Sequence, residues 1–148
     1  MAYWRLFYHF VWTTKNRTPL ITPELEPHLY RWLHKEAKEL YCPFFYIDGV
    51  ADHIHVLTAV RPSLSPADFM KQLKGSSSRF VGLKFPRAFE WQVGYGVLSV
   101  SEQQIDPVKA YVLNQKTHHA QQSTLAEWEE THEWNWGPES HLQMEVRE

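Results

Sequence analysis

Two histidines, His53 and His55, lie two positions apart in the run Asp52-His53-Ile54-His55-Val56-Leu57, which is rich in β-type residues. On an extended strand, side chains two positions apart point to the same face, so we expect neighbouring imidazoles whose Cα atoms are roughly 6–7 Å apart. Neutral imidazoles are good ligands for a divalent cation. The alternative is an ordinary surface or core pair, so a metal site needs partners from elsewhere in the chain.

A second pair of chemically useful residues is Tyr111 and Gln115, which are four positions apart in a predicted helix. On one helix face their Cβ atoms would be about 5–6 Å apart, so a phenol nucleophile and an amide oxygen ligand would lie together. Alternatively, Tyr111 borders the core and Gln115 is its solvated neighbour. His118 and His119 follow closely and are rival ligands, whereas His9 is expected to be an ordinary surface or core histidine.

The elements that must position these residues alternate along the chain. Strands are predicted at residues 4–12, 44–50, 53–60 and 91–100. Helices are predicted to start at Thr22-Pro23, Ser65-Pro66 and Asp106-Pro107, where a capping side chain precedes a proline; the first reaches about residue 40 and the third about residue 121. The order predicts an α+β fold: a ferredoxin-like (split βαβ) antiparallel sheet with helices on one face, plus a C-terminal helix.

Length and composition predict a single domain. We expect residues 1–122 to form it and residues 123–148 to be an acidic, Trp-rich extension of the same domain. No apolar run is long enough to span a membrane, and the N-terminus shows no signal-peptide cleavage pattern. The single cysteine, Cys42, cannot form an internal disulfide, which indicates a reducing cytoplasm.

Charge is distributed unevenly, although the formal net charge is only −2. Residues 61–87 contain six basic side chains and one acid, while residues 121–148 contain seven Glu and one Arg. Such a basic middle section can bind a polyanion. On the second predicted helix we expect phosphate contacts from basic side chains and a hydroxyl, although a solvated basic face is the alternative; these residues are Lys71, Lys74, Ser76 and Arg79.

Taken together, four segments resemble the single-tyrosine HUH transposases of insertion sequences. Their order and spacing are similar to that family from about residue 4 to residue 120. No single segment is decisive, but four in register are highly specific. The segments are Asp52-His53-Ile54-His55, residues 69–79, residues 91–97 and Tyr111-Val112-Leu113-Asn114-Gln115.

The resemblance implies a role for each matching residue. His53, His55 and Gln115 would bind a divalent metal, Mg²⁺ or Mn²⁺, and Tyr111 would be the nucleophile. The expected activity is cleavage and rejoining of single-stranded DNA at hairpin-bearing element ends through a 5′-phosphotyrosine. The resemblance also implies a homodimer whose active sites are shared between subunits.

Other functions are compatible with the same residues. One is a host-adapted tyrosine nuclease associated with repeated palindromes, which would use the same chemistry. Another is a non-catalytic ferredoxin-like module that binds nucleic acid, and a third is a metal-binding dimer with no nucleic-acid role. The last two predict that no covalent protein–DNA product forms.

Overall fold

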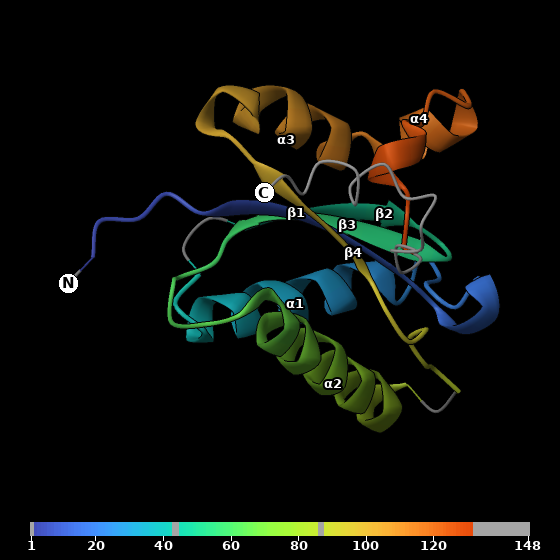
Figure 1. The fold of residues 1–148 in the computed structure, drawn as a ribbon. Coiled ribbons are helices and arrows are strands. Elements are labelled where there is room, and N and C mark those ends of the chain that lie inside the picture. The colour runs from blue at the N-terminus through green and yellow to red at the C-terminus, as the bar shows by residue number, and fades with distance from the viewer. Residues whose placement is uncertain (1, 43–44, 86–87, 132–148) are drawn as a thin grey trace, which may run out of the picture.

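A four-stranded antiparallel sheet forms the centre of the protein, whose computed structural model describes residues 2–42, 45–85 and 88–131 (Figure 1). The strand order is β2-β3-β1-β4. The bounds are Phe7–Thr13 for β1, Phe45–Val50 for β2, His53–Ala59 for β3 and Gly96–Val100 for β4. Together with helices on its faces, this sheet confirms the predicted ferredoxin-like α+β fold.

Alternation along β3 separates the core from the candidate site. Ile54 and Val56 are fully buried in the main core cluster, which α1 (Glu26–Glu39) and α2 (Pro66–Lys84) cover. His53 and His55 belong to the opposite set of alternating positions, so they lie on the face covered by α3 (Ile105–Leu113). The sheet therefore holds the two histidines on a rigid strand.

Helices α1 (Glu26–Glu39) and α2 (Pro66–Lys84) pack side by side below the sheet in Figure 1. The predicted cap of α2 is confirmed, because Ser65 Oγ accepts a hydrogen bond of 3.0 Å from the Asp68 amide. Helix α1 begins later than predicted. Thr22 does accept a 3.2 Å bond from the Leu25 amide, but it caps a turn that precedes the helix.

On the other face, the predicted third helix is divided into α3 (Ile105–Leu113) and α4 (Gln115–Ala120), so the prediction of one continuous helix was wrong. The break is at Asn114, with φ −117° and ψ 31°. The Asn114 side chain donates to the Ala110 carbonyl, and the backbone N–H of Gln115 donates to Asp48 Oδ2 at 3.2 Å. Both bonds compete with those of a continuous helix.

The last strand is also shorter than predicted. Residues 91–95 lie outside β4; Trp91 forms an isolated bridge with Thr14, and Gly94 has a φ of 96° that favours glycine. Beyond α4, the chain returns over the sheet and forms a short 3₁₀ turn, Ala126–Trp128. The predicted extension from residue 132 onward lies outside the described residues. Within the described ranges, no helix has the length and apolar character needed to cross a membrane.

Candidate metal and nucleophile site

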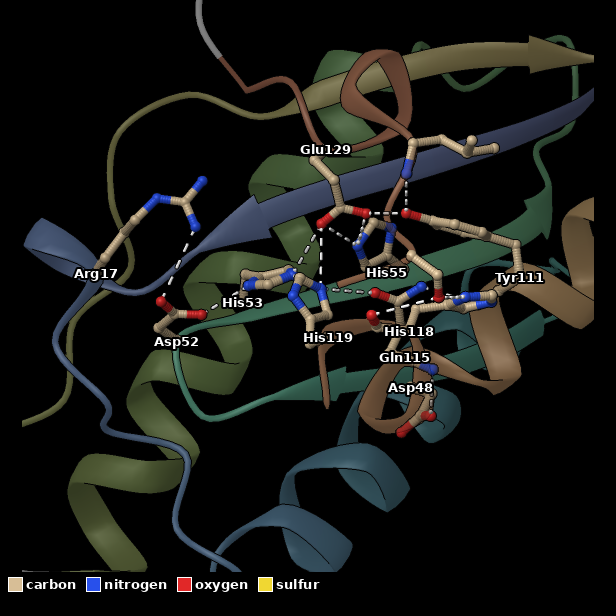
Figure 2. A network of polar contacts seen from close by, with 12 residues as sticks. Arg17, Asp48, Asp52, His53, His55, Tyr111, Gln115, His118, His119 and Glu129 are labelled. Atoms are coloured by element: carbon tan, nitrogen blue, oxygen red, sulfur yellow. Dashed lines mark hydrogen bonds and ion pairs between the residues drawn. The ribbon is translucent and has the colours of Figure 1, made fainter. Parts of the chain in front are cut away.

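His53 and His55 each have one ring nitrogen held by a neighbouring side chain. His53 Nδ1 lies 2.6 Å from Asp52 Oδ1, and Asp52 also forms an ion pair of 3.9 Å with Arg17. His55 Nδ1 lies 2.8 Å from Nε2 of His9. These partners fix the two rings so that both Nε2 atoms face the same space (Figure 2).

Tyr111 and Gln115 reach the same place from the helical layer. The Tyr111 ring centroid is 5.8 Å from that of His55, and both rings are buried. Gln115 is fully buried; its Nε2 donates to the Tyr111 carbonyl at 2.8 Å, and its Oε1 lies 3.2 Å from Nε2 of His119. The structure thus brings the four predicted residues together within one chain, although Tyr111 and Gln115 do not share a continuous helix.

Glu129, which the sequence analysis did not assign, lies at the centre of this group. One of its carboxylate oxygens is 3.1 Å from His53 Nε2 and 3.3 Å from His119 Nε2, and the other is 3.1 Å from His55 Nε2. One ligand atom from each of His53, His55, His119 and Glu129 lies within 4.8 Å of the others. This cluster has the composition and spacing to hold a metal ion.

The Tyr111 hydroxyl is held by the segment that contains Glu129. It donates a hydrogen bond to Glu129 Oε2 and accepts one of 3.0 Å from the Leu125 amide. The ring stacks on His118 at 4.6 Å between centroids and meets the edge of Trp128 at 4.9 Å. The phenol is therefore fixed beside the histidines.

Burial sets the protonation of the group. Burial and the hydrogen bond to Glu129 raise the pKa of Tyr111, so the phenol keeps its proton at neutral pH. Burial lowers the pKa of His55 and of His119, which leaves their imidazoles neutral. Burial opposes ionisation of Glu129, but the bonds to His53 and His55 hold its pKa below the usual range. Neutral imidazoles and an ionised carboxylate are the forms that bind metals.

His9 is a further neighbour of the candidate site, although sequence reasoning interpreted it as an ordinary surface or core histidine. On β1, Val11 pairs with His55, and His9 lies two positions away on the same face. Its side chain is only 1% exposed. The signal for this contact is the strand register, which pairs residues far apart in the sequence.

Acid is expected to destabilise the metal-free protein through His9. Burial and the neighbouring His55 lower the pKa of His9 from 6.5 to about 3, so the unfolded chain binds more protons between these values. The free energy of unfolding should therefore fall as the pH drops from 6.5 to about 3, by on the order of 4 kcal/mol from this group. Urea unfolding with chelator at several pH values measures this; His9→Gln should flatten the dependence, and an unchanged slope would contradict the assignment.

Helix α2, which carries the predicted phosphate-binding residues, lies on the opposite face of the sheet from α3 and α4 (Figure 1). Lys71, Ser76 and Arg79 line a groove of about 670 Å³ between α1 and α2. Ser76 Oγ accepts a 3.0 Å bond from the Trp32 indole. Lys74 instead donates to the carbonyls of Gln92 and Gly94, at 2.7 and 2.9 Å, and so fastens the loop before β4.

A family model and a known transposase both match most of this chain. The model of the family described as "Transposase IS200 like" matches residues 2–115, a range that contains His53, His55, Tyr111 and Gln115. The ISDra2 transposase TnpA of Deinococcus radiodurans is 28% identical over 119 residues, which cover 76% of this chain and 85% of that protein.

Two solved structures have a similar fold. A crystal structure of a transposase from Deinococcus radiodurans superposes with a TM-score of 0.63 and 28% identity, covering 78% of this chain and 95% of that one. A REP-associated tyrosine transposase bound to a REP hairpin has a TM-score of 0.56 and 16% identity, covering 80% of this chain and 74% of that one. On the family match over residues 2–115, the chain belongs to the IS200-like transposases.

Proposed function

We propose that this transposase cleaves and rejoins single-stranded DNA through Tyr111, assisted by a divalent metal at His53 and His55. The observation that carries the proposal is the convergence of a phenol and two imidazoles. The Tyr111 hydroxyl and the Nε2 atoms of both histidines all contact one carboxylate, that of Glu129. The proposed nucleophile and the proposed metal ligands are thereby adjacent within a single chain.

The donor atoms fit a divalent metal. Both imidazoles are nearly inaccessible, and their outer nitrogens are engaged by Asp52 and His9, which leaves the inner nitrogens to act as ligands. A cation held there by His53 and His55 would polarise the phosphate and offset the charge that develops during attack. We propose Mn²⁺ or Mg²⁺, and nitrogen ligands favour Mn²⁺ of the two.

Each residue then has a defined task. The Tyr111 oxygen attacks phosphorus, the bond from phosphorus to the 3′ oxygen breaks, and the products are a 5′-phosphotyrosine and a free 3′-hydroxyl. The phenol gives up its proton along its hydrogen bond to Glu129 Oε2, and the departing 3′ oxygen takes up a proton from water to become the hydroxyl. The covalent intermediate conserves the bond energy, so attack by a 3′-hydroxyl rejoins DNA without ATP.

We propose that the substrate is single-stranded DNA with a hairpin. The similar fold of a transposase bound to a REP hairpin supports this substrate. The groove at Lys71, Ser76 and Arg79 offers cationic and hydroxyl groups for phosphates on the other side of the sheet. Lys74, predicted to bind phosphate as well, instead donates to the backbone carbonyls of Gln92 and Gly94 and is not among the residues that line this groove.

We extend the proposal to a homodimer, as the family resemblance implies. Strands β2 and β4 are the outer members of the sheet order, and edge strands offer backbone groups for pairing with another chain. Val97 of β4 exposes 39% of its surface, which supports β4 as the contacting edge. Sedimentation of the purified protein tests this assembly.

The activity is tested with hairpin-bearing oligonucleotides labelled at either end and incubated with Mn²⁺ or Mg²⁺. We expect a denaturation-resistant adduct that retains the 3′-end label and releases the 5′-end label, because the 5′ phosphate joins the protein. Chelator should prevent its formation. Binding that is insensitive to chelator and yields no adduct would instead identify a non-catalytic nucleic-acid-binding module.

A further inference from the structure

We infer that His119 and Glu129 complete the metal site with His53 and His55. They would take the ligand role that the family resemblance gives to Gln115. This inference rests on the proposed function only in sharing the two strand histidines. It assigns a metal-binding role to His119 of α4 and to Glu129 of the following segment, both of which lie beyond residues 2–115 matched by the family model. The proposed ligand set is three imidazoles and one carboxylate.

The distances among these donors support the assignment. His53 Nε2 is 3.0 Å from His119 Nε2, and the Glu129 oxygens are 3.1 to 3.3 Å from the three imidazole nitrogens. Ligands bound about 2.1 Å from one divalent ion lie roughly 3 Å from each other, so the four groups already have a spacing suited to coordination. Figure 2 shows them directed at one point from β3, α4 and the following segment.

Gln115 lies behind His119 as seen from this point. Its oxygen is 3.2 Å from Nε2 of His119, and its amide group is bound to the Tyr111 carbonyl. A carboxamide is also a weaker ligand than an ionised carboxylate, which adds a negative charge. Glu129 is therefore expected to bind the cation more strongly than Gln115 does.

The segment that contains Glu129 is seated by contacts other than the carboxylate. The Ser123 amide donates to the His118 carbonyl at 2.8 Å, and the Trp128 ring meets His9 edge-on at 5.7 Å. The Glu130 carbonyl lies so close to Gly96 that a Cβ on that residue would be 2.0 Å from its oxygen. Glycine at this position in β4 therefore makes room for the segment, which supports a well-defined position for Glu129 in the folded chain.

The donor set also predicts which divalent ions the site binds best. Three imidazoles and one carboxylate suit Mn²⁺, Co²⁺ and Zn²⁺, whereas Mg²⁺ prefers a shell of oxygen atoms. Through its other oxygen, Glu129 also binds the Tyr111 hydroxyl. The ligand set would thus link the nucleophile to the ion through one carboxylate.

Calorimetric titration of the full-length protein with MnCl₂ tests the inference without DNA. Glu129→Gln and His119→Ala should each weaken Mn²⁺ binding by at least about 10-fold, the lower limit for loss of groups that merely orient ligands. The exposed Glu127 offers a matched control, because Glu127→Gln makes the same change of charge and should leave the affinity unaltered. Gln115→Ala should affect binding far less than Glu129→Gln.

A second variant leaves every ligand in place. Gly96→Ala should displace the Glu130 backbone and so weaken Mn²⁺ binding, while Gly82→Ala is the control because its Cβ meets nothing within 4 Å. Circular dichroism establishes that the variants are folded. If Gly96→Ala does not fold, the result for Glu129→Gln decides alone.

Two outcomes would overturn the inference. Unaltered affinity in Glu129→Gln means that the carboxylate is not a ligand, and tighter binding means that it competes with the ion for the histidines. Either result, with adduct formation intact in the unsubstituted protein, leaves the proposed function standing. Conversely, Glu129-dependent binding of Mn²⁺ without any DNA adduct would support this metal site and contradict the proposed function.

Discussion

Tyr111→Phe is expected to abolish the covalent protein–DNA adduct completely, because phenylalanine has no oxygen with which to attack phosphorus. The ring and its stacking on His118 are retained, so the site keeps its shape. Mn²⁺ should still bind, with an affinity lower by no more than roughly 10–100-fold, because the phenol is not among the inferred ligands but does hold Glu129 through a hydrogen bond. The measurement is denaturing electrophoresis of labelled DNA with protein and Mn²⁺.

The control for this variant is Tyr46→Phe, which removes a hydroxyl from the same face of the sheet. Tyr46 packs against the cluster that includes Leu57, with the Lys109 amine 4.3 Å from its ring centroid. Its substitution should leave adduct formation intact. Tyr111→Phe also loses bonds to Glu129 and Leu125, which should lower the free energy of unfolding by roughly 1–3 kcal/mol. An adduct that persists in folded Tyr111→Phe would identify another nucleophile.

Much of the fold was predictable because local rules and tertiary structure agree. On β3, alternation places Ile54 and Val56 in the core and the two histidines on the other face. At α2, the Ser65 hydroxyl and the following proline define the start of the helix. The break at Asn114 was not predictable in the same way. It depends on Asp48, which is distant in sequence and accepts a hydrogen bond from the backbone N–H of Gln115.

The candidate site was predictable only where its residues form short, regularly spaced pairs. His53 with His55 and Tyr111 with Gln115 are such pairs, and family resemblance connected them. Glu129 lies in a segment with no periodic pattern, among several other glutamates, so neither spacing nor composition distinguishes it. Its position depends on the fit of the neighbouring backbone against Gly96, which is a property of the folded chain.

His55→Gln is expected to reduce adduct formation by roughly 10²–10³-fold, the scale of losing one preorganised charge-stabilising group. His55 is fully buried, and it links the Glu129 carboxylate to His9. Loss of the imidazole removes a proposed metal ligand and disturbs both neighbours, so Mn²⁺ affinity should fall as well. His34→Gln, on the exposed side of α1, makes the same substitution and should behave as the unsubstituted protein. Equal adduct yields from both variants would contradict a role for His55.

Mixing the two inactive variants determines which chain supplies the tyrosine. In the structure, Tyr111 lies against His55 of its own chain, with centroids 5.8 Å apart, and both contact the same Glu129. Each site would then need both residues from one polypeptide, so a mixture of Tyr111→Phe and His55→Gln should form no adduct beyond the sum of the separate variants. Recovery of adduct in the mixture would mean that a tyrosine from one subunit serves the histidines of the other, as the family resemblance implies. In that case the arrangement within one chain would be a state that precedes exchange of α3 and α4 between subunits.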